Sequence, residues 1–211
     1  MPIHRTIPAL VLGLALAACN GNRDRSAATN APGSPETATV PADTTATSDT
    51  SAMSSASAPS NLSDANIVAL LDHANAADST AGALAATKAT NPGVKQFAKL
   101  MMSEHHALRK QGRDLAKQLK LTPEPPANDP VTALAQQETQ ALQSAPKGAE
   151  FDRTYIDQEV AAHQAVLDLA KQAHDQADNE QLKALIEKAQ PVIEKHLDQA
   201  KQLQQKLQTS A

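Results

Sequence analysis

The sequence predicts an all-helical domain, a four-helix bundle built from two long helical hairpins with a short extra helix in the middle connection. Three observations predict this fold class. Ala, Leu, Gln and Lys, all good helix formers, dominate the second half of the 211-residue chain. Aromatic residues make up 1% of the chain, whereas strands draw on aromatic and β-branched side chains. Apolar residues also recur at helical spacing along four long stretches.

Residues 1–18 have the pattern of a secretory signal peptide, with a short basic start and an apolar run too brief to span a bilayer. The run ends in Leu16-Ala17-Ala18-Cys19, which resembles the bacterial lipobox. That resemblance implies cleavage before Cys19 and acylation of its thiol, which anchors the chain to a membrane. Asn20 follows instead of Asp, so we expect an outer-membrane lipoprotein facing the periplasm. An ordinary signal peptide with an incidental cysteine is the alternative.

Residues 19–60 are rich in Ala, Ser, Thr and Pro and contain almost no large apolar side chains. Such a segment cannot bury enough surface to offset the entropy lost on ordering. We therefore expect a disordered tether anchored at Cys19, followed by a helical domain over residues 61–208. The sequence does not distinguish a spacer of selected length from a low-complexity segment.

The first predicted hairpin contains helices over residues 63–90 and 92–120. Ser63 or Asp64 can cap the first helix, and Asn91-Pro92-Gly93 ends it. A proline-rich segment ends the second helix. Both stretches carry apolar residues on one side, which predicts that they pack against each other.

The connection and the second hairpin complete the domain. Asp129-Pro130 predicts the start of a shorter helix with Leu134 and Leu142 facing inward. Two further long helices are expected over residues 149–177 and 180–207, separated by a polar turn. The long connection between the hairpins is compatible with a simple return or a crossover, so the topology stays open.

Polar side chains interrupt the apolar faces near the middle of each long helix. On a helical wheel, the inward-facing ones are His105, His163, His196, Asp78 and Glu104, with Glu159, Asp152 and Tyr155 on or beside the same faces. Asp78 and Glu104 lie equally far along the chain from Asn91, and His163 and His196 lie at similar distances from the second turn. The side chains should therefore meet in one layer.

Three interpretations of this layer compete. The first is a single transition metal (Zn, Fe, Mn or Cu) held by His105, His163 and His196, with Asp78 and Glu104 as ligands or supporting groups. Further hydrogen-bond partners would be Glu159, Asp152 and Tyr155. The second is a buried polar network that fixes packing and binds nothing. The third is a pH-responsive element, because histidines titrate near neutral pH.

Several segments together resemble the bacterial domain of unknown function 4142 family over about residues 66–203. They are Val94–Ala98 followed by Glu104-His105, the segment Gly148–Tyr155, Val160 with His163, and Pro191 with His196. The resemblance implies a ferritin-like four-helix bundle in a predicted outer-membrane lipoprotein, and it implies no established reaction. Asp78 and Glu104 stand where the family more often has Glu and Asp, so both positions keep a carboxylate.

The composition excludes several function classes. With 19 basic and 23 acidic residues and a net charge of −4, the chain is not expected to bind nucleic acid. Cys19 is the single cysteine, and the seven glycines form no phosphate-binding loop. The sequence favours a non-enzymatic, membrane-tethered periplasmic module that binds a ligand or serves envelope stress, with no identified protein partner. A metal-binding ferritin-like protein, possibly catalytic, and a structural envelope protein are the alternatives.

Overall fold

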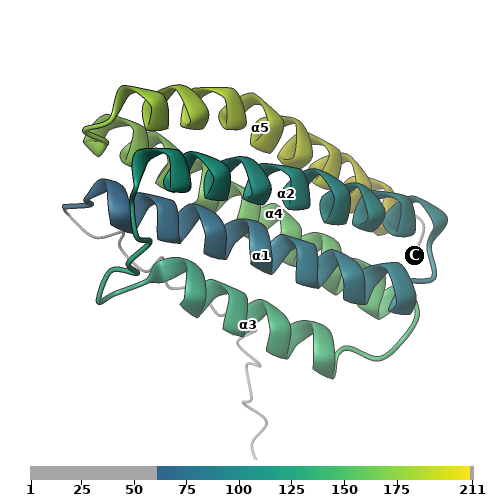
Figure 1. Ribbon diagram of the computed structural model, residues 1–211. Helices are drawn as coiled ribbons and strands as arrows, with labels where there is room; N and C mark the ends of the chain where they lie inside the picture. The colour runs from purple at the N-terminus through teal and green to yellow at the C-terminus, as the bar shows by residue number, and fades with distance from the viewer. Residues whose placement is uncertain (1–60, 210–211) are drawn as a thin grey trace, which may run out of the picture. The chain divides into compact units, whose positions relative to one another are not determined.

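A computed structural model describes residues 61–209, which form five α-helices and no strand (Figure 1). The helices are α1 (Asp64–Lys88), α2 (Pro92–Leu119), α3 (Pro130–Ser144), α4 (Ala149–Gln176) and α5 (Glu180–Thr209). The all-helical prediction is thus confirmed. None of the described helices is long and apolar enough to cross a membrane. The predicted signal peptide, the tether and the lipidation of Cys19 lie outside the described residues.

Polar side chains cap three of the helices, two of them, α1 and α3, at the predicted positions. Ser63 caps α1 in a reciprocal arrangement with Asn66, in which each side chain accepts a hydrogen bond from the other residue's backbone N–H. The Asn91 side chain accepts hydrogen bonds from the first turn of α2, and Asp129 does the same for α3. Each of these two caps is followed by a proline at the first helical position, where its missing N–H costs nothing.

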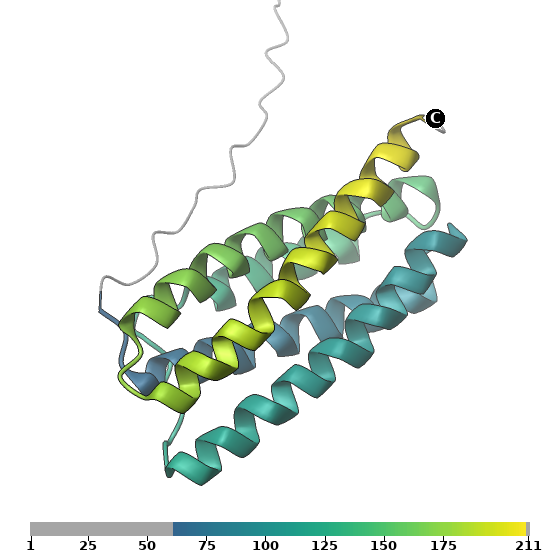
Figure 2. The same ribbon diagram turned by 90° about the horizontal axis from the view of Figure 1, so that it is seen from above.

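Successive helices run in opposite directions (Figures 1 and 2). α1 packs along α2, and α4 packs along α5. The two pairs also contact each other, α1 against α4 and α2 against α5. All four long helices can therefore direct side chains into one shared interior.

The connection between α2 and α4 is a crossover, which resolves the topology that the sequence left open. It leaves α2 beside the start of α1, where Asn66 Nδ2 donates a hydrogen bond of 2.8 Å to the Glu124 carbonyl oxygen. It enters α4 at the other end of α1, where the Asp152 carboxylate accepts a hydrogen bond from the Thr90 backbone N–H. α3 covers the distance between these ends and packs against α1 and α4 (Figure 1).

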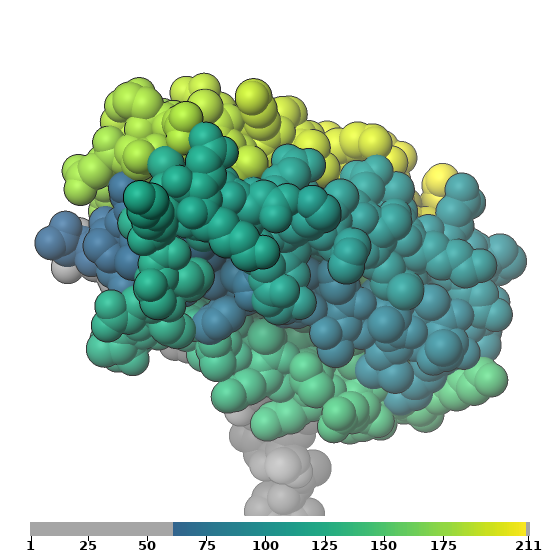
Figure 3. All heavy atoms as spheres, viewed as in Figure 1, coloured from purple at the N-terminus to yellow at the C-terminus, as the bar shows by residue number. Residues whose placement is uncertain are grey.

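The buried apolar side chains divide into two clusters along the helices. One cluster contains Ile67 and Leu182, and the other contains Phe97 and Phe151. Between them the helices carry buried polar residues, namely Asp78, His105, Glu138, Glu159, His163 and His196. Side chains of α1, α2 and α5 cover the face seen in Figure 3, so this polar layer lies within the packed helices.

Candidate metal centre

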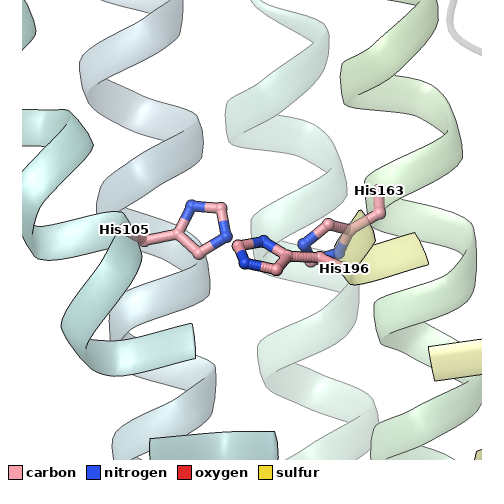
Figure 4. Close-up of side chains that lie close together, drawn as sticks. All are labelled: His105, His163 and His196. Carbon is pink, nitrogen blue, oxygen red and sulfur yellow. The ribbon is translucent and has the colours of Figure 1, made fainter. Parts of the chain in front are cut away.

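Three histidines from three different helices converge in the polar layer. His105 comes from α2, His163 from α4 and His196 from α5, and their rings turn toward one another (Figure 4). The ring centroid of His105 lies 5.4 Å from that of His163 and 5.1 Å from that of His196. The centroids of His163 and His196 are 5.5 Å apart. The residues are 3%, 2% and 0% exposed, respectively. Each ring can present one nitrogen within 4.8 Å of a nitrogen on the other two.

On each ring, one nitrogen already contacts a hydrogen-bond acceptor. The pairs are His105 Nδ1 with Asn75 Oδ1 at 3.0 Å, His163 Nδ1 with the Glu159 carbonyl oxygen at 2.9 Å, and His196 Nε2 with Glu104 Oε2 at 2.6 Å. Because the partners accept, we assign the ring proton to the contacting nitrogen in each case. The acceptors thereby set both the tautomer and the orientation of each ring.

The remaining nitrogen of each ring has no hydrogen-bond partner among the described residues. These atoms are His105 Nε2, His163 Nε2 and His196 Nδ1, and all three are buried. A buried acceptor without a donor costs about 1–3 kcal/mol, and native structures rarely leave one unexplained. Three such lone pairs in one layer could serve as the donors of a metal site with three imidazole ligands.

Burial favours the neutral form that binds metals in two of these rings, His163 and His196. Burial lowers the pKa of His163, although the charge of Asp78 acts in the opposite direction. Burial also lowers the pKa of His196 to about 4, opposed by the Glu104 hydrogen bond and aided by the other two rings. Both rings are therefore neutral at pH 7, so no proton competes with a metal for their lone pairs.

A group of carboxylates borders the histidines. Asp78 on α1 and Glu159 on α4 can each place an oxygen within 4.8 Å of each other and of a His163 nitrogen. Asp78 Oδ2 is 3.3 Å from His105 Nδ1, and Glu159 Oε2 is 3.3 Å from His163 Nδ1. Burial, followed by the charges of Asp78 and Glu138, raises the pKa of Glu159 well above its usual range.

Glu104 and Tyr155 lie beside the layer in supporting positions. Glu104 contacts Nε2 of His196 and not the unpartnered Nδ1, and the Glu104 side chain is 33% exposed. Tyr155 is fully buried one turn before Glu159 on α4. Its hydroxyl interacts with the Glu159 carboxyl without the geometry of a strict hydrogen bond. Burial and this carboxyl raise the pKa of Tyr155 well above its ordinary value.

Asp152 does not join the layer, although the sequence placed it beside the same face. It lies in the first turn of α4, about three turns before His163. Its carboxylate accepts hydrogen bonds from the Thr90 N–H at 2.8 Å, the Thr90 hydroxyl at 2.6 Å and the Asn91 N–H at 2.8 Å. Asp152 therefore holds the α1–α2 turn against the start of α4.

Two residues of the layer were missed by the sequence analysis. Glu138 is 3% exposed on α3, where burial and the charge of Asp78 raise its pKa to about 8. Its position midway between Leu134 and Leu142, at a spacing of one helical turn, could have revealed it. Asn75, the partner of His105, gives no comparable signal, because asparagine is common on exposed helix surfaces.

A cavity of about 40 Å³ connects the layer with a more exposed part of the protein. Buried Asp78 and His105 line it, together with apolar side chains of all four long helices. Asp72, Arg109 and Arg113 also line it, and their side chains are 19%, 31% and 52% exposed. The volume is enough for about one or two water-sized molecules.

Comparison with known proteins identifies one family. A family model described as "Domain of unknown function (DUF4142)" matches residues 48–203, a range that contains every residue of the polar layer. No curated protein and no solved structure matches the chain. The comparison therefore supplies no activity, and the function has to be argued from the layer.

Proposed function

The chain belongs to the DUF4142 family, and from this premise we propose that it binds a transition-metal ion on His105, His163 and His196. One observation carries the proposal: each of the three buried rings has one nitrogen held by an acceptor and one nitrogen with no partner. A polar network without a ligand would be expected to satisfy these nitrogens internally.

The donor set limits which metals fit. Three neutral imidazoles suit Zn, Cu or Fe, and Mn becomes suitable where carboxylates contribute. Three protein ligands also leave a coordination position open, which distinguishes catalytic metal sites from closed structural ones. The cavity at His105 can admit a water-sized molecule toward that position. When bound, the metal would supply Lewis acidity or redox chemistry toward such a molecule.

We further propose that α1, α2, α4 and α5 make a ferritin-like four-helix bundle, with α3 in the crossover. The two antiparallel pairs, the contacts between them and the long crossover support this arrangement. A dinuclear iron centre of the oxidase type is not part of the proposal. Such centres use two Glu-x-x-His pairs, whereas Glu104 directly precedes His105 and Glu159 precedes His163 by four residues.

We also propose that acyl chains on Cys19 anchor the protein in the outer membrane, with the helices in the periplasm. The lipobox-like residues and Asn20 support this location. A binding or envelope-stress module, the role that the sequence favours, is compatible with a bound metal. Mass spectrometry of the mature N-terminus tests the anchor: acyl chains on Cys19 support it, and an unmodified thiol contradicts it.

Metal content tests the proposed function. We would purify the full-length chain without chelator or histidine tag and measure its metals by plasma mass spectrometry. The variant His105→Ala/His196→Ala removes two of the three imidazoles and should lose near-stoichiometric metal. His106→Ala is the matched control, because His106 neighbours His105 in α2 but is exposed, and it should retain the metal.

Two results would contradict the metal function. The first is a wild-type protein that is metal-free and takes up none of Zn²⁺, Cu²⁺, Fe²⁺ or Mn²⁺ on titration. The second is a metal content that the double variant retains while circular dichroism shows its helices intact. Either result would leave the histidines as a packing network.

A further inference from the structure

Three acidic side chains are buried beside the histidines and come from three different helices. Asp78 on α1 is 4% exposed, Glu138 on α3 is 3% exposed and Glu159 on α4 is 0% exposed. Oxygens of Asp78 and Glu159 can approach within 4.8 Å of each other and of His163. Glu138 is close enough to interact electrostatically with both.

Two of these carboxyl groups, those of Glu138 and Glu159, have oxygens that no hydrogen bond from the described part of the chain satisfies. Both carboxylate oxygens of Glu159 and one of Glu138 are buried without a hydrogen-bond partner among the described residues. Within residues 61–209, the side chains at ion-pair distance from Asp78 and Glu159 are the histidines His105 and His163. A buried carboxylate is costly unless a cation or hydrogen bonds compensate its charge.

From this arrangement we propose a second cation site, in which Asp78 and Glu159 hold a divalent metal ion beside His163, with Glu138 as a third buried acid nearby. The unpartnered oxygens of Glu159 supply coordinating atoms. The ion would replace the protons of the buried acids, and its charge would then offset that of the ionised carboxylates. Carboxylate oxygen donors favour a hard cation such as Mn²⁺ over softer metals. This inference extends the proposed metal function but uses a different set of ligands.

α3 contributes a nearby carboxyl group and borders a groove that leads toward the site. An open groove of about 460 Å³ runs between α1 and α3 and is lined by small and polar side chains, including Ala77, Thr80 and Thr139. Glu138 also lines this groove. A cation entering between the two helices would therefore pass the Glu138 side chain. The crossover helix thus gives the second site its own access, separate from the cavity at His105.

A two-metal titration tests the second site. The full-length chain is loaded with one equivalent of Zn²⁺ and titrated with Mn²⁺, whose free form is followed by electron paramagnetic resonance. We expect the wild type to bind one Mn²⁺ per chain. Glu159→Gln and Glu138→Gln keep the side-chain shape and lie on different helices, and each should weaken Mn²⁺ binding by at least about tenfold. Asp157→Asn, the control, removes an exposed acid from α4 and should leave Mn²⁺ binding unchanged.

The variant His105→Ala/His196→Ala separates the two sites. It should lose Zn²⁺ from the histidine site and still bind one Mn²⁺ at the carboxylates. If the wild type binds Zn²⁺ through the histidines but no Mn²⁺, or if Glu159→Gln binds Mn²⁺ like the wild type, the second site is rejected and the first stands. If the wild type binds neither metal, both sites are rejected.

Discussion

At the scale of single residues, the histidines are oriented by acceptors of three kinds. A side-chain amide contacts His105, a backbone carbonyl contacts His163, and the Glu104 carboxylate contacts His196. Each acceptor belongs to a helix, so ring orientation follows from the fold and does not require a bound metal. Such preorganisation lowers the cost of binding, because the ligands are already ordered.

Asp72 provides a prediction about pH at the same scale. Burial raises its pKa, but hydrogen bonds from Arg109 and Arg113 outweigh burial and lower it from 3.8 to about 2. A lowered pKa means that the folded state favours the carboxylate. The ionised Asp72 therefore contributes its full stabilisation of the fold above pH 3.8, and this contribution is lost as the pH falls toward about 2.

The variant Asp72→Asn should therefore be less stable than wild type by about 1 kcal/mol at pH 7, since partial exposure screens the ion pairs. Most of the difference should disappear near pH 2, because the folded-state carboxyl of the wild type is then about half protonated. Urea unfolding at both pH values measures this. An equal difference at the two values would show that the charge of Asp72 does not contribute.

At the scale of elements, the α1–α2 hairpin depends on a close approach at Gly82. A Cβ atom added there would lie 2.8 Å from the Ala98 carbonyl oxygen and 3.1 Å from Met102 Cγ. The backbone oxygen cannot move aside without shifting α2. Because Asp78 lies one turn before Gly82 on α1, the separation of α1 and α2 also affects the spacing of the polar layer.

Gly82→Ala should therefore destabilise the protein by about 1–3 kcal/mol, although alanine is normally the better helix former. The matched control is Gly112→Ala in the same hairpin, where an added Cβ meets nothing within 4 Å. That change should stabilise by up to about 1 kcal/mol. Thermal unfolding of both variants measures the contrast, and two effects of the same sign would argue against a tight contact at Gly82.

At the scale of the whole molecule, the polar layer joins all five helices. The histidines come from α2, α4 and α5, and the carboxylates come from α1, α3 and α4. Two apolar clusters pack on either side of this layer. A metal bound there would connect helices that are far apart in sequence, and the unfolded chain cannot reproduce such a site.

Metal binding should consequently stabilise the entire domain. At a free Zn²⁺ concentration a hundred times its Kd, we expect about 2.7 kcal/mol of added stability, reversed by chelator. Calorimetry with Zn²⁺ and with EDTA measures the shift in Tm. The variant His105→Ala/His196→Ala should show no rise in Tm when Zn²⁺ is added. A wild type that binds Zn²⁺ without any rise in Tm would mean that the ion binds outside the folded core.

Much of this architecture could be predicted from the sequence. Helix starts at Ser63, Asn91 and Asp129 depend on contacts within a few residues, so capping rules identify them. The inward direction of His105 and Asp78 depends on rotation about one helix axis, which the positions of neighbouring apolar residues determine. Such features are local, and the amino-acid order contains them.

Which partner each side chain meets was decided by the tertiary structure. The sequence placed Glu104 and Asp78 at the same level of the first hairpin but did not give their partners: Glu104 contacts His196, and Asp78 lies beside His105. The crossover brings α3 onto α1 and α4, which buries Glu138 beside the other carboxylates. The physical reason is that contacts between distant residues depend on how helices pair and cross, which the packing of the entire core determines. Sequence alone determined the helices and the faces of the candidate ligands, and only the packed fold decided how those ligands are grouped.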